Sequence, residues 1–573
     1  MLKGYIIQPA DDDFESLTLF AGLLEQIDFE HLIELFEFVI SPSEKVVNGA
    51  IYTPSYIRDY IAENTLQMYM GQLNDIKAVD PSCGCGGFLL TLAILINKEL
   101  GKSFAEIFRE NIYGIDIAEY STQRARLLLS LYAVINGEDV LQFDFNLQTD
   151  NSLTFNWRAN CPEIEANDGF DIVVGNPPYV CSRNMDSQTL DLIKGLDVCR
   201  TGHPDLYIPF FQIGLEQLNA YGVLGYITVN TFIKSVNGRA LRAYFHDHDV
   251  NITLLNFGGE QIFKNRNTYT CICFLRYGAG RVNYLRTPAS GLKGIDFSAL
   301  HRFSYSDLNH NDGWNLLNDQ ASIDFVSKIE STGEPFKLLY NTKNGIATLK
   351  NDVYKFSPIR SDDQNHFMED NGRIFPIERS ICRRIVNANK VKCHADIERI
   401  VEQIIFPYTF DLKIIAEDTM ERDFPNAYAY LRTKMAVLAT RDKGARSYEA
   451  WYAYGRRQSM DINAFKLFFP HICDRPKFVI CEEQDLLFYN GIALVTQDLE
   501  ELHVIKKLLE SDLFFRYIRY STKDYASGYI SMSRNHLKNF GVFQFTYEQK
   551  TQLLLTDDVE HFLEDLYGIK STV

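Results

Sequence analysis

The sequence predicts an α/β protein, in which a Rossmann-like, doubly wound sheet is followed by a C-terminal α+β domain. Up to about residue 280, short apolar runs bounded by Gly, Pro or Asp alternate with segments of helical periodicity, which is typical of parallel sheets covered by helices. Beyond that region the alternation stops. The runs, with their helical segments, are Ile76–Val79 with 88–100, Ile112–Ile115 with 119–136, Phe170–Val174, and Val223–Thr228 with 238–246.

The flanking regions divide the chain further. Residues 14–40 carry apolar side chains at helical spacing and predict one or two amphipathic helices. Residues 285–340 form a polar, mixed connection, and the part after it mixes short strands with helices such as 497–519 and 546–567. We therefore expect an N-terminal helical segment at 1–45, an α/β domain at 46–330 and an α+β domain at 331–573.

Composition restricts the class of protein. A chain of 573 residues that is 46% hydrophobic can bury a large core and exceeds one ordinary domain. It contains no apolar run of about 18 residues, and its acidic N-terminus does not resemble a signal peptide, so we expect a cytoplasmic protein without membrane association. Of eleven cysteines only Cys83/Cys85 and Cys271/Cys273 are closely spaced. Because no CxxC pairs recur, we expect free thiols and no metal site.

The net charge of −18 argues at first against a nucleic-acid partner. Two segments depart from it: residues 371–400 hold seven Lys/Arg against three acids, a balance of +4, and residues 431–460 hold seven against two, a balance of +5. Two basic segments in an acidic chain would confine DNA to one surface. For any single arginine, a solvated helix face is the competing interpretation.

A glycine-rich turn is the first motif with a chemical interpretation. It runs Ala78-Val79-Asp80-Pro81-Ser82-Cys83-Gly84-Cys85-Gly86-Gly87-Phe88, from a predicted strand end into an apolar helix. Glycines let the backbone approach a ligand closely, and a helix start offers free N–H groups. A methionine or nucleotide moiety would fit there, although such turns are often only structural.

An acid follows the next predicted strand, in Ile112-Tyr113-Gly114-Ile115-Asp116-Ile117. A carboxylate at the end of the second strand of a Rossmann-like unit can accept hydrogen bonds from both ribose hydroxyls. The alternative is that Asp116 caps the following helix. The two motifs together favour a nucleoside-containing ligand.

The third motif is Asn176-Pro177-Pro178-Tyr179, directly after the strand Phe170–Val174. The amino group of adenine is a poor nucleophile because its lone pair is delocalised into the ring. Acceptors on its two N–H bonds, namely the Asn176 side-chain oxygen and the Pro177 carbonyl, would draw the nitrogen toward tetrahedral geometry. The prolines fix the direction of that carbonyl, so the acceptors need no reorganisation. Tyr179 would stack on the base.

In this order the motifs resemble the gamma-class amino-methyltransferases of restriction-modification systems, the TaqI methyltransferase group. The resemblance implies methyl transfer from S-adenosylmethionine to N6 of an adenine flipped out of double-stranded DNA. It implies a cofactor site in which Thr53, in Tyr52-Thr53-Pro54, closes over the methionine end. The remaining implied cofactor residues are Asp80, Ser82, Gly84, Gly86, Asp116, Ile117, Asn151, Asn176 and Phe210.

Two of these implied assignments have close alternatives. Asp150 could replace Asn151 near the cofactor adenine after a one-residue shift, and Phe210, in Asp205-Leu206-Tyr207-Ile208-Pro209-Phe210, could equally be a core aromatic. In Gly259-Glu260-Gln261-Ile262-Phe263, the resemblance implies that Phe263 stacks on the flipped base opposite Tyr179.

The C-terminal part contains weaker motifs that resemble target-recognition domains. They are Asn344-Gly345-Ile346-Ala347-Thr348, Trp451-Tyr452-Ala453-Tyr454-Gly455-Arg456-Arg457 and Leu566-Tyr567-Gly568-Ile569. Because they lie in the same region as the basic segments, Arg456 and Arg457 are candidate DNA contacts. A separately encoded restriction endonuclease is a further expected partner of such an enzyme.

Other functions use the same tetrapeptide. A protein glutamine methyltransferase would not explain Thr53-Pro54 or more than 200 residues after the catalytic domain, and an rRNA base methyltransferase is a second alternative. A catalytically silent DNA-binding subunit is disfavoured by the intact Asn176-Pro177-Pro178-Tyr179. The sequence shows no Pro-Asp…Glu-x-Lys nuclease pattern, so methylation without cleavage is preferred. Enzymes that methylate cytosine N4 usually have Ser in place of Asn176.

Overall fold

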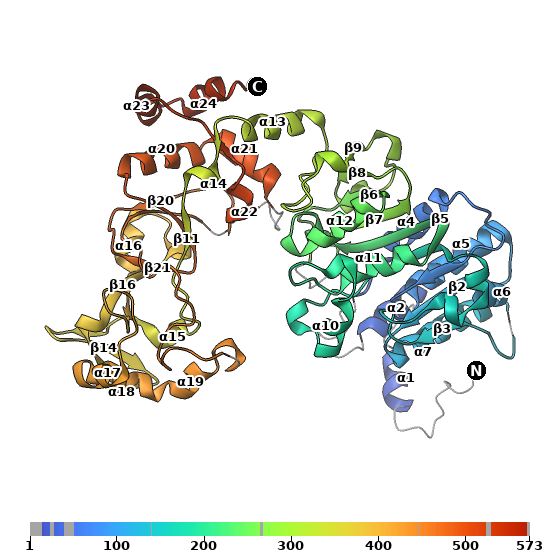
Figure 1. Cartoon of the computed structure of the whole chain (residues 1–573). Coiled ribbons are helices and arrows are strands. Elements are labelled where there is room, and N and C mark those ends of the chain that lie inside the picture. Colours follow the sequence, from blue (N-terminus) through green and yellow to red (C-terminus); the bar gives the residue numbers. More distant parts are fainter. Residues whose placement is uncertain are drawn as a thin grey trace. The chain divides into compact units, whose positions relative to one another are not determined.

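The computed structural model describes residues 14–22, 28–38, 51–138, 140–263, 268–444, 446–470, 472–522 and 529–569. The chain forms two compact units, an N-terminal unit, Met1–Gln320, and a C-terminal unit, Ala321–Val573. The division between the two units lies between Gln320 and Ala321, whereas the sequence predicted a domain boundary between residues 330 and 331. The expected N-terminal helical segment falls in the same unit as the α/β domain. Figure 1 traces both units.

A nine-stranded sheet in the order β3-β2-β1-β4-β5-β7-β6-β8-β9 forms the centre of the N-terminal unit. From β3 to β5 neighbouring strands are parallel, whereas β7 runs antiparallel to both β5 and β6. The strand order reverses between β1 and β4, which is where ligands bind in open α/β sheets. The strands are β1 Ala78–Asp80, β2 Ile112–Asp116, β3 Asn146–Thr149, β4 Phe170–Gly175, β5 Leu218–Val229, β6 Val250–Asn256, β7 Thr270–Tyr277, β8 Arg281–Arg286 and β9 His301–Ser304.

Helices cover both faces of this sheet, as Figure 1 shows, so the predicted doubly wound α/β fold is confirmed. Ile172 and Val174 of β4 share one core with the helices α4, α5 and α7. On the other face Phe211 of α11 packs edge to face against Tyr226 and Phe245. The helices are α1 Phe14–Gly22, α2 Phe29–Phe38, α4 Ser55–Met68, α5 Gly87–Leu100, α6 Phe104–Glu110, α7 Glu119–Ile135, α8 Trp157–Asn160, α9 Pro162–Ala166, α10 Ser187–Ile193, α11 Tyr207–Glu216 and α12 Arg239–Asp247.

One expectation about this part of the chain needs correction, and another agrees with the structure. The stretch expected as a polar connection, 285–340, contains β9, which pairs antiparallel with β8 and extends the main sheet. It also contains the helix α13, Gln320–Glu330. The helices α1 and α2 lie within the expected amphipathic stretch 14–40, of which residues 23–27, 39 and 40 lie outside the described residues.

The C-terminal unit is built from several small sheets with helices around them, and no long parallel sheet appears among its described residues. The larger sheets have the orders β11-β22-β18-β20, β12-β17-β16-β21 and β13-β14-β15. Their strands are β11 Thr342–Asn344, β12 Lys355–Phe356, β13 Arg360–Ser361, β14 Asn365–Asp370, β15 Arg373–Glu378, β16 Cys382–Asn387, β17 Glu402–Ile405, β18 Phe465–Phe468, β20 Val479–Cys481, β21 Leu487–Tyr489 and β22 Ile492–Thr496. Two short pairs join β10 Glu334–Pro335 to β24 Gly541–Val542 and β19 Ile472–Cys473 to β23 Ile530–Ser531.

The long helices expected in this unit are each divided in two. Residues 497–519 form α20 and the start of α21, because the side chain of Ser511 caps α21 by accepting from the Phe514 amide. Residues 546–567 form α23 and α24, where Asp558 caps the second helix. The helices are α14 Phe336–Leu339, α15 Asn351–Tyr354, α16 His394–Ile400, α17 Glu417–Asp423, α18 Pro425–Thr433, α19 Met435–Ala439, α20 Leu499–Leu509, α21 Asp512–Ser521, α22 Arg534–Leu537, α23 Tyr547–Leu555 and α24 Val559–Tyr567.

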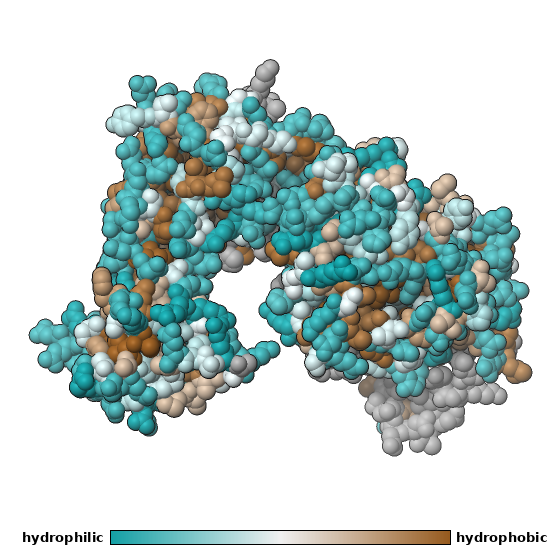
Figure 2. Space-filling view, in the orientation of Figure 1, coloured by the Kyte–Doolittle hydropathy of each residue, from teal (hydrophilic) through white to brown (hydrophobic). Residues whose placement is uncertain are grey.

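The surfaces of both units are mainly polar in the view of Figure 2, where hydrophilic residues predominate and apolar side chains show in smaller areas. Among the described residues, no helix combines the length and the apolar character needed to cross a bilayer. All eleven cysteines are free thiols, and Cys83, Cys85, Cys271 and Cys273 are buried.

Candidate functional site

The candidate site lies where four neighbouring strands end. Asp80 is the last residue of β1 and Asp116 the last residue of β2, and Asn176 follows β4 directly. Parallel pairing aligns these ends, with Asp80 opposite Gly114 and Asp116 opposite Thr149 of β3. The carboxyl edge of the sheet therefore gathers two carboxylates and an amide beside the point where the strand order reverses.

The glycine turn between β1 and α5 is shaped by two left-handed backbones, Gly84 at φ 52° and Gly86 at φ 89°. Only glycine adopts these values readily. A Cβ on Gly86 would also come within 2.9 Å of the Ala125 Cβ on α7, so this glycine allows the two helices to pack closely. Gly84 lines the cavity described below, whereas Gly86 is not among the lining residues.

Asp116 connects the glycine turn to the end of β2. Its two oxygens accept backbone hydrogen bonds from Gly84, at 3.0 Å, and from Ala118, at 2.9 Å. Burial raises the pKa of this carboxyl above its ordinary value, against the effect of these hydrogen bonds. Each carboxylate oxygen can accept a second hydrogen bond, so the group can still bind hydroxyl donors.

Asp80 is almost completely buried, and its Oδ1 accepts from the Ser82 amide at 2.9 Å. Burial raises the pKa of this carboxyl to about 8, and the negative charge of Asp116 adds to the shift. A bound cation would reverse that shift, because an opposite charge favours the ionised carboxylate. Asp80 is thus suited to a positively charged part of a ligand.

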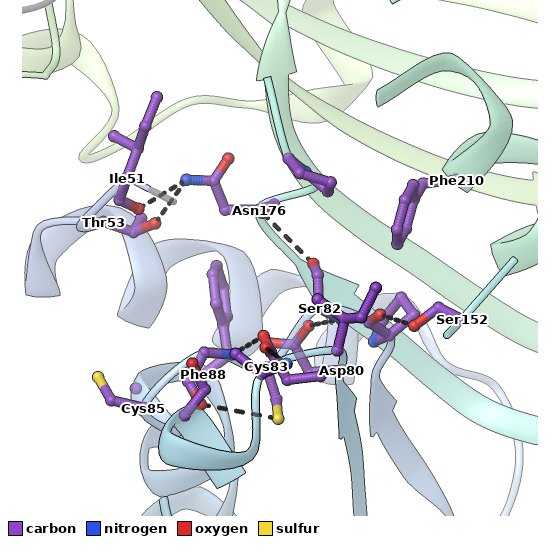
Figure 3. A pocket seen from close by; sticks show the side chains of 18 of the residues that line it. Ile51, Thr53, Asp80, Ser82, Cys83, Cys85, Phe88, Ser152, Asn176 and Phe210 are labelled. Carbon is purple, nitrogen blue, oxygen red and sulfur yellow. Dashed lines mark hydrogen bonds between the residues drawn. The ribbon is translucent and has the colours of Figure 1, made fainter. Parts of the chain in front are cut away.

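A cavity of about 220 Å³ opens among these residues. Most of the predicted cofactor residues line it: Thr53, Asp80, Ser82, Gly84, Asp116, Ile117, Asn151, Asn176 and Phe210. Figure 3 labels five of them around this space, namely Thr53, Asp80, Ser82, Asn176 and Phe210. Ile117 is an exposed hydrophobic side chain, whereas Phe210, on α11, is buried. Pro178 lines the cavity, whereas Pro177, Tyr179 and Phe263 are not among its lining residues.

The side-chain amide of Asn176 is held in one orientation. Its Nδ2 donates to the Ile51 carbonyl at 3.2 Å and to Thr53 Oγ1 at 3.0 Å, and Figure 3 shows the Oδ1 turned away from both acceptors. Because both groups on that side accept hydrogen bonds, the NH₂ end of the amide faces them and the oxygen faces the other way. Oδ1 is buried and has no hydrogen-bond partner, which leaves an acceptor ready for a ligand N–H.

Tyr179, the last residue of the motif that begins at Asn176, contacts Phe263. Their ring centroids are 6.1 Å apart in an edge-to-face arrangement, and Tyr207 packs edge to face on the other side of Tyr179. The Tyr179 hydroxyl donates to the Ile227 carbonyl of β5 at 3.2 Å. The two predicted base-stacking side chains are therefore neighbours, although no parallel slot separates their rings.

The loop after β3 approaches the glycine turn through Ser152, whose hydroxyl donates to the Pro81 carbonyl at 2.6 Å. Asn151 lines the cavity, and its Oδ1 accepts from the Leu153 amide at 3.0 Å. Asp150, the alternative to Asn151, is not among the lining residues; its carboxylate accepts from the Asn151 amide.

Sequence reasoning did not single out several lining residues. Ile33 comes from α2, Arg58 from α4, and Asp186 and Thr189 from the N-terminal end of α10. Their sequence positions carry no recognisable motif, because each reaches the cavity through tertiary packing. Ser152 directly follows the predicted Asn151 and could have been selected for its hydroxyl group.

In the C-terminal unit, both candidate DNA contacts are paired with acids. Arg456 forms a two-pronged ion pair with Asp442, at 2.8 and 3.0 Å, and lowers the pKa of that carboxyl to about 2. Arg457 pairs with Glu449 at 2.9 Å and also donates to the Leu412 carbonyl. Both side chains remain partly solvent-accessible, so they can contact a further anion only in competition with these acids.

Comparisons with known proteins find similarity to restriction-modification methyltransferases. Residues 110–263 match the family model described as Eco57I restriction-modification methylase. The chain is 26% identical over 500 residues to the type II restriction enzyme and methyltransferase RM.Eco57I of Escherichia coli, covering 75% of this chain and about half, 49%, of that protein. It is 22% identical over 527 residues to the type II methyltransferase M.BanIII of Aneurinibacillus aneurinilyticus, covering 85% of this chain and 86% of that one.

A solved structure shares the fold. The type IIL restriction-modification enzyme MmeI, determined in complex with DNA, aligns with 95% of this chain and 80% of its own, with a TM-score of 0.61 and 13% sequence identity.

Proposed function

Because residues 110–263 carry an Eco57I restriction-modification methylase domain, we propose that this protein methylates N6 of adenine in double-stranded DNA, with S-adenosylmethionine as methyl donor. The observation that carries the proposal is the Asn176 amide, whose NH₂ is bound by Ile51 and Thr53 while its buried Oδ1 has no partner. An unpartnered buried acceptor requires a donor, and an exocyclic amino group supplies one.

The residues around the cavity fit S-adenosylmethionine by their chemistry. Asp116 offers acceptors for ribose hydroxyls, Ile117 and Phe210 offer apolar surfaces for an adenine ring, and Asp80 offers a carboxylate for the cationic methionine end. Thr53 and the backbone of Gly84 would enclose that end. When bound, the cofactor supplies an electrophilic methyl group on a sulfonium centre. The expected roles of Ser82 and Asn151 rest on their position in the same lining.

The protein's part in the reaction is to bind and orient the amino group. Asn176 Oδ1 and the Pro177 carbonyl would each accept one N–H of the target nitrogen and so localise its lone pair for attack. Pro177 and Pro178 restrict the backbone, which fixes the direction of that carbonyl before the substrate arrives. Orientation and proximity then contribute much of the rate.

Access to the target requires that the adenine leaves the duplex. Tyr179 and Phe263 are the aromatic side chains assigned to the base in the proposed scheme, and their ring centroids are 6.1 Å apart. A flipped base would stack on Tyr179 and displace the edge of Phe263. Stacking on the two rings would offset part of the cost of unstacking the base.

The C-terminal unit would recognise the DNA sequence. Its position after the methylase domain and its two basic segments support this role, and Arg456 and Arg457 remain candidate contacts despite their acidic partners. A separately encoded endonuclease would complete a restriction-modification system, and the cytoplasm is the expected location.

The proposal is tested by expressing the chain in a bacterial host that lacks DNA methylation of its own and sequencing the modified bases. We expect N6-methyladenine at one recurring sequence, and none in cells that carry Asn176→Ala. Parallel assays on rRNA and on a release factor test the two other substrate classes of the tetrapeptide. Methyl transfer to either of those substrates without N6-methyladenine in DNA would overturn the proposal, and so would N4-methylcytosine in its place.

A further inference from the structure

The helix α2 contributes to the cavity although it precedes every motif of the fold. Its Ile33 is buried and lines the cavity wall, and its Glu30 lies in the first turn, directed at the start of α4. Glu30 is the acceptor for three neighbouring residues of that region. Its carboxylate accepts from the Tyr52 hydroxyl, from the Ser55 amide at 3.1 Å and from the Arg58 guanidinium at 2.6 Å.

Arg58 continues these contacts toward the site. It is only 4% exposed, and besides its ion pair with Glu30 it donates from Nη1 to the Thr53 carbonyl at 2.7 Å. A buried arginine is tolerated when its charge is paired, and both terminal nitrogens of Arg58 are bonded here. Glu30 and Arg58 therefore hold the backbone of Thr53, and Arg58 itself also lines the cavity.

Thr53 is the link to the catalytic amide. Its backbone carbonyl is bound by Arg58, and its Oγ1 accepts from Asn176 Nδ2 at 3.0 Å. The other acceptor of that NH₂ group, the Ile51 carbonyl at 3.2 Å, lies two residues earlier in the same segment. The segment 51–53 thus decides which end of the Asn176 amide faces the target.

We propose that Glu30 and Arg58 are positioning residues, which hold the segment 51–53 so that Asn176 presents its oxygen to the adenine amino group. The proposal rests on the proposed function and adds α2 to its catalytic unit. Its physical basis is that displacement of a catalytic group by about 1 Å can cost roughly 10²-fold in rate. A purely structural contact would instead affect folding and every binding step together.

The test compares Glu30→Gln and Arg58→Met with Glu34→Gln, in the purified full-length protein. Glu34 is exposed on the same helix, so its variant removes the same charge from α2 without touching Arg58. On duplex DNA with the mapped target sequence, we expect the single-turnover methylation rate of the first two variants to fall roughly 10- to 100-fold. For Glu30→Gln, which lies outside the cavity lining, the cofactor and DNA dissociation constants should stay within about twofold, and Glu34→Gln should match the wild type.

Thr53 provides the second readout. Thr53→Val removes the acceptor for Asn176 Nδ2, whereas Thr53→Ser keeps it, so the valine variant should be slow and the serine variant close to wild type. If Glu30 acts through Thr53, Glu30→Gln should slow the Thr53→Val protein less than it slows the wild type, because residues of one network are not additive. Full additivity, an unchanged rate in Glu30→Gln, or equal losses of rate and cofactor binding would each overturn the proposal.

Hydrogen exchange gives a measurement that needs no methylation. The peptide covering residues 51–58 should exchange its amide hydrogens faster in Glu30→Gln than in Glu34→Gln, because the Ser55 amide loses a charged acceptor. Equal exchange in the two variants would overturn the proposal even in an active enzyme. If the wild-type protein methylates no DNA, the proposed function is overturned instead. The exchange comparison would still show whether Glu30 restricts the motion of residues 51–58.

Discussion

Replacing Asn176 by alanine separates the catalytic role of this side chain from a structural one. The asparagine makes two hydrogen bonds through Nδ2, to Ile51 at 3.2 Å and to Thr53 at 3.0 Å, and leaves Oδ1 buried without a partner. Alanine removes all three features at once. If Oδ1 orients the adenine amino group, the variant should bind cofactor and DNA but transfer the methyl group slowly.

The expected magnitudes can be worked from these contacts. Two neutral hydrogen bonds contribute about 0.5–1.5 kcal/mol each to stability, whereas an unpartnered buried acceptor costs about 1–3 kcal/mol. The loss and the relief are similar in size, but the Ile51 carbonyl and the Thr53 hydroxyl lose their donor, so the free energy of unfolding should fall by no more than about 3 kcal/mol. Loss of one preorganised hydrogen-bonding group typically lowers kcat by roughly 10²–10³, about 2.7–4 kcal/mol in the transition state.

Three measurements on the purified Asn176→Ala protein decide the matter: single-turnover methylation, cofactor affinity by titration calorimetry, and the free energy of unfolding in urea. Asn97→Ala is the matched control, because Asn97 on α5 also bonds through its amide, to the Lys102 carbonyl at 2.8 Å, but does not line the cavity. Near-normal turnover in Asn176→Ala would refute the mechanism. A large loss of stability or of cofactor binding would show that the amide is structural.

Three further predictions follow from the site and from the C-terminal unit. Asp116→Ala should weaken cofactor binding by at least roughly tenfold, the loss of about one charge-assisted hydrogen bond, with kcat at saturation little changed; equal affinity in calorimetry would exclude the ribose role. Asp80 has a pKa of about 8 in the folded protein without ligand, above the ordinary 3.8, so its contribution to stability is fully present below about pH 4 and is lost as the pH rises through 8. Asp80→Asn should flatten this part of the pH dependence in urea unfolding, and an unchanged slope between pH 6 and 9 would contradict the raised pKa. Replacing Arg456 and Arg457 by glutamine should weaken DNA binding and lower its salt slope by less than about 0.9 per arginine, because both are already ion-paired; an unchanged slope would place them outside the interface.

The parts of the site that sequence could predict are those where local pattern and chemistry coincide. A short apolar run followed by Asp80 or Asp116 specifies a buried strand with a polar residue at its carboxyl end, and parallel pairing brings such ends to one edge. Asn176-Pro177-Pro178-Tyr179 follows the same rule after β4. These residues needed no knowledge of distant contacts, whereas Thr53, Asn151 and Phe210, which line the same cavity, were implied by the resemblance.

The rest depends on contacts between residues far apart in the chain. The orientation of the Asn176 amide is set by Ile51 and Thr53, more than 120 positions earlier. No α-helix of the described residues directly precedes β7 or β9, so the alternation of strands and helices did not predict them. The strand β9 joins the sheet only through its partner β8. Gly86 was expected to contact the cofactor. In the structure, a Cβ added at this position would come within 2.9 Å of the Ala125 Cβ on a neighbouring helix, a constraint that no local pattern reveals.

The contact between Tyr179 and Phe263 bears on how a flipped base would enter. An edge-to-face aromatic pair contributes about 0.5–1.5 kcal/mol beyond its buried area, whereas stacking of one base on an aromatic side chain contributes about 1–3 kcal/mol. When a base stacks on the two rings in place of their edge-to-face contact, the free energy gained by stacking is therefore larger than the free energy of the contact that is lost. Without DNA the rings cover each other, which keeps two large apolar surfaces out of water. The two rings would thus stay in contact in the free enzyme and separate only when a planar ligand stacks on them. Stacking would then select a base, and the Asn176 oxygen would accept a hydrogen bond only from a base that carries an amino group.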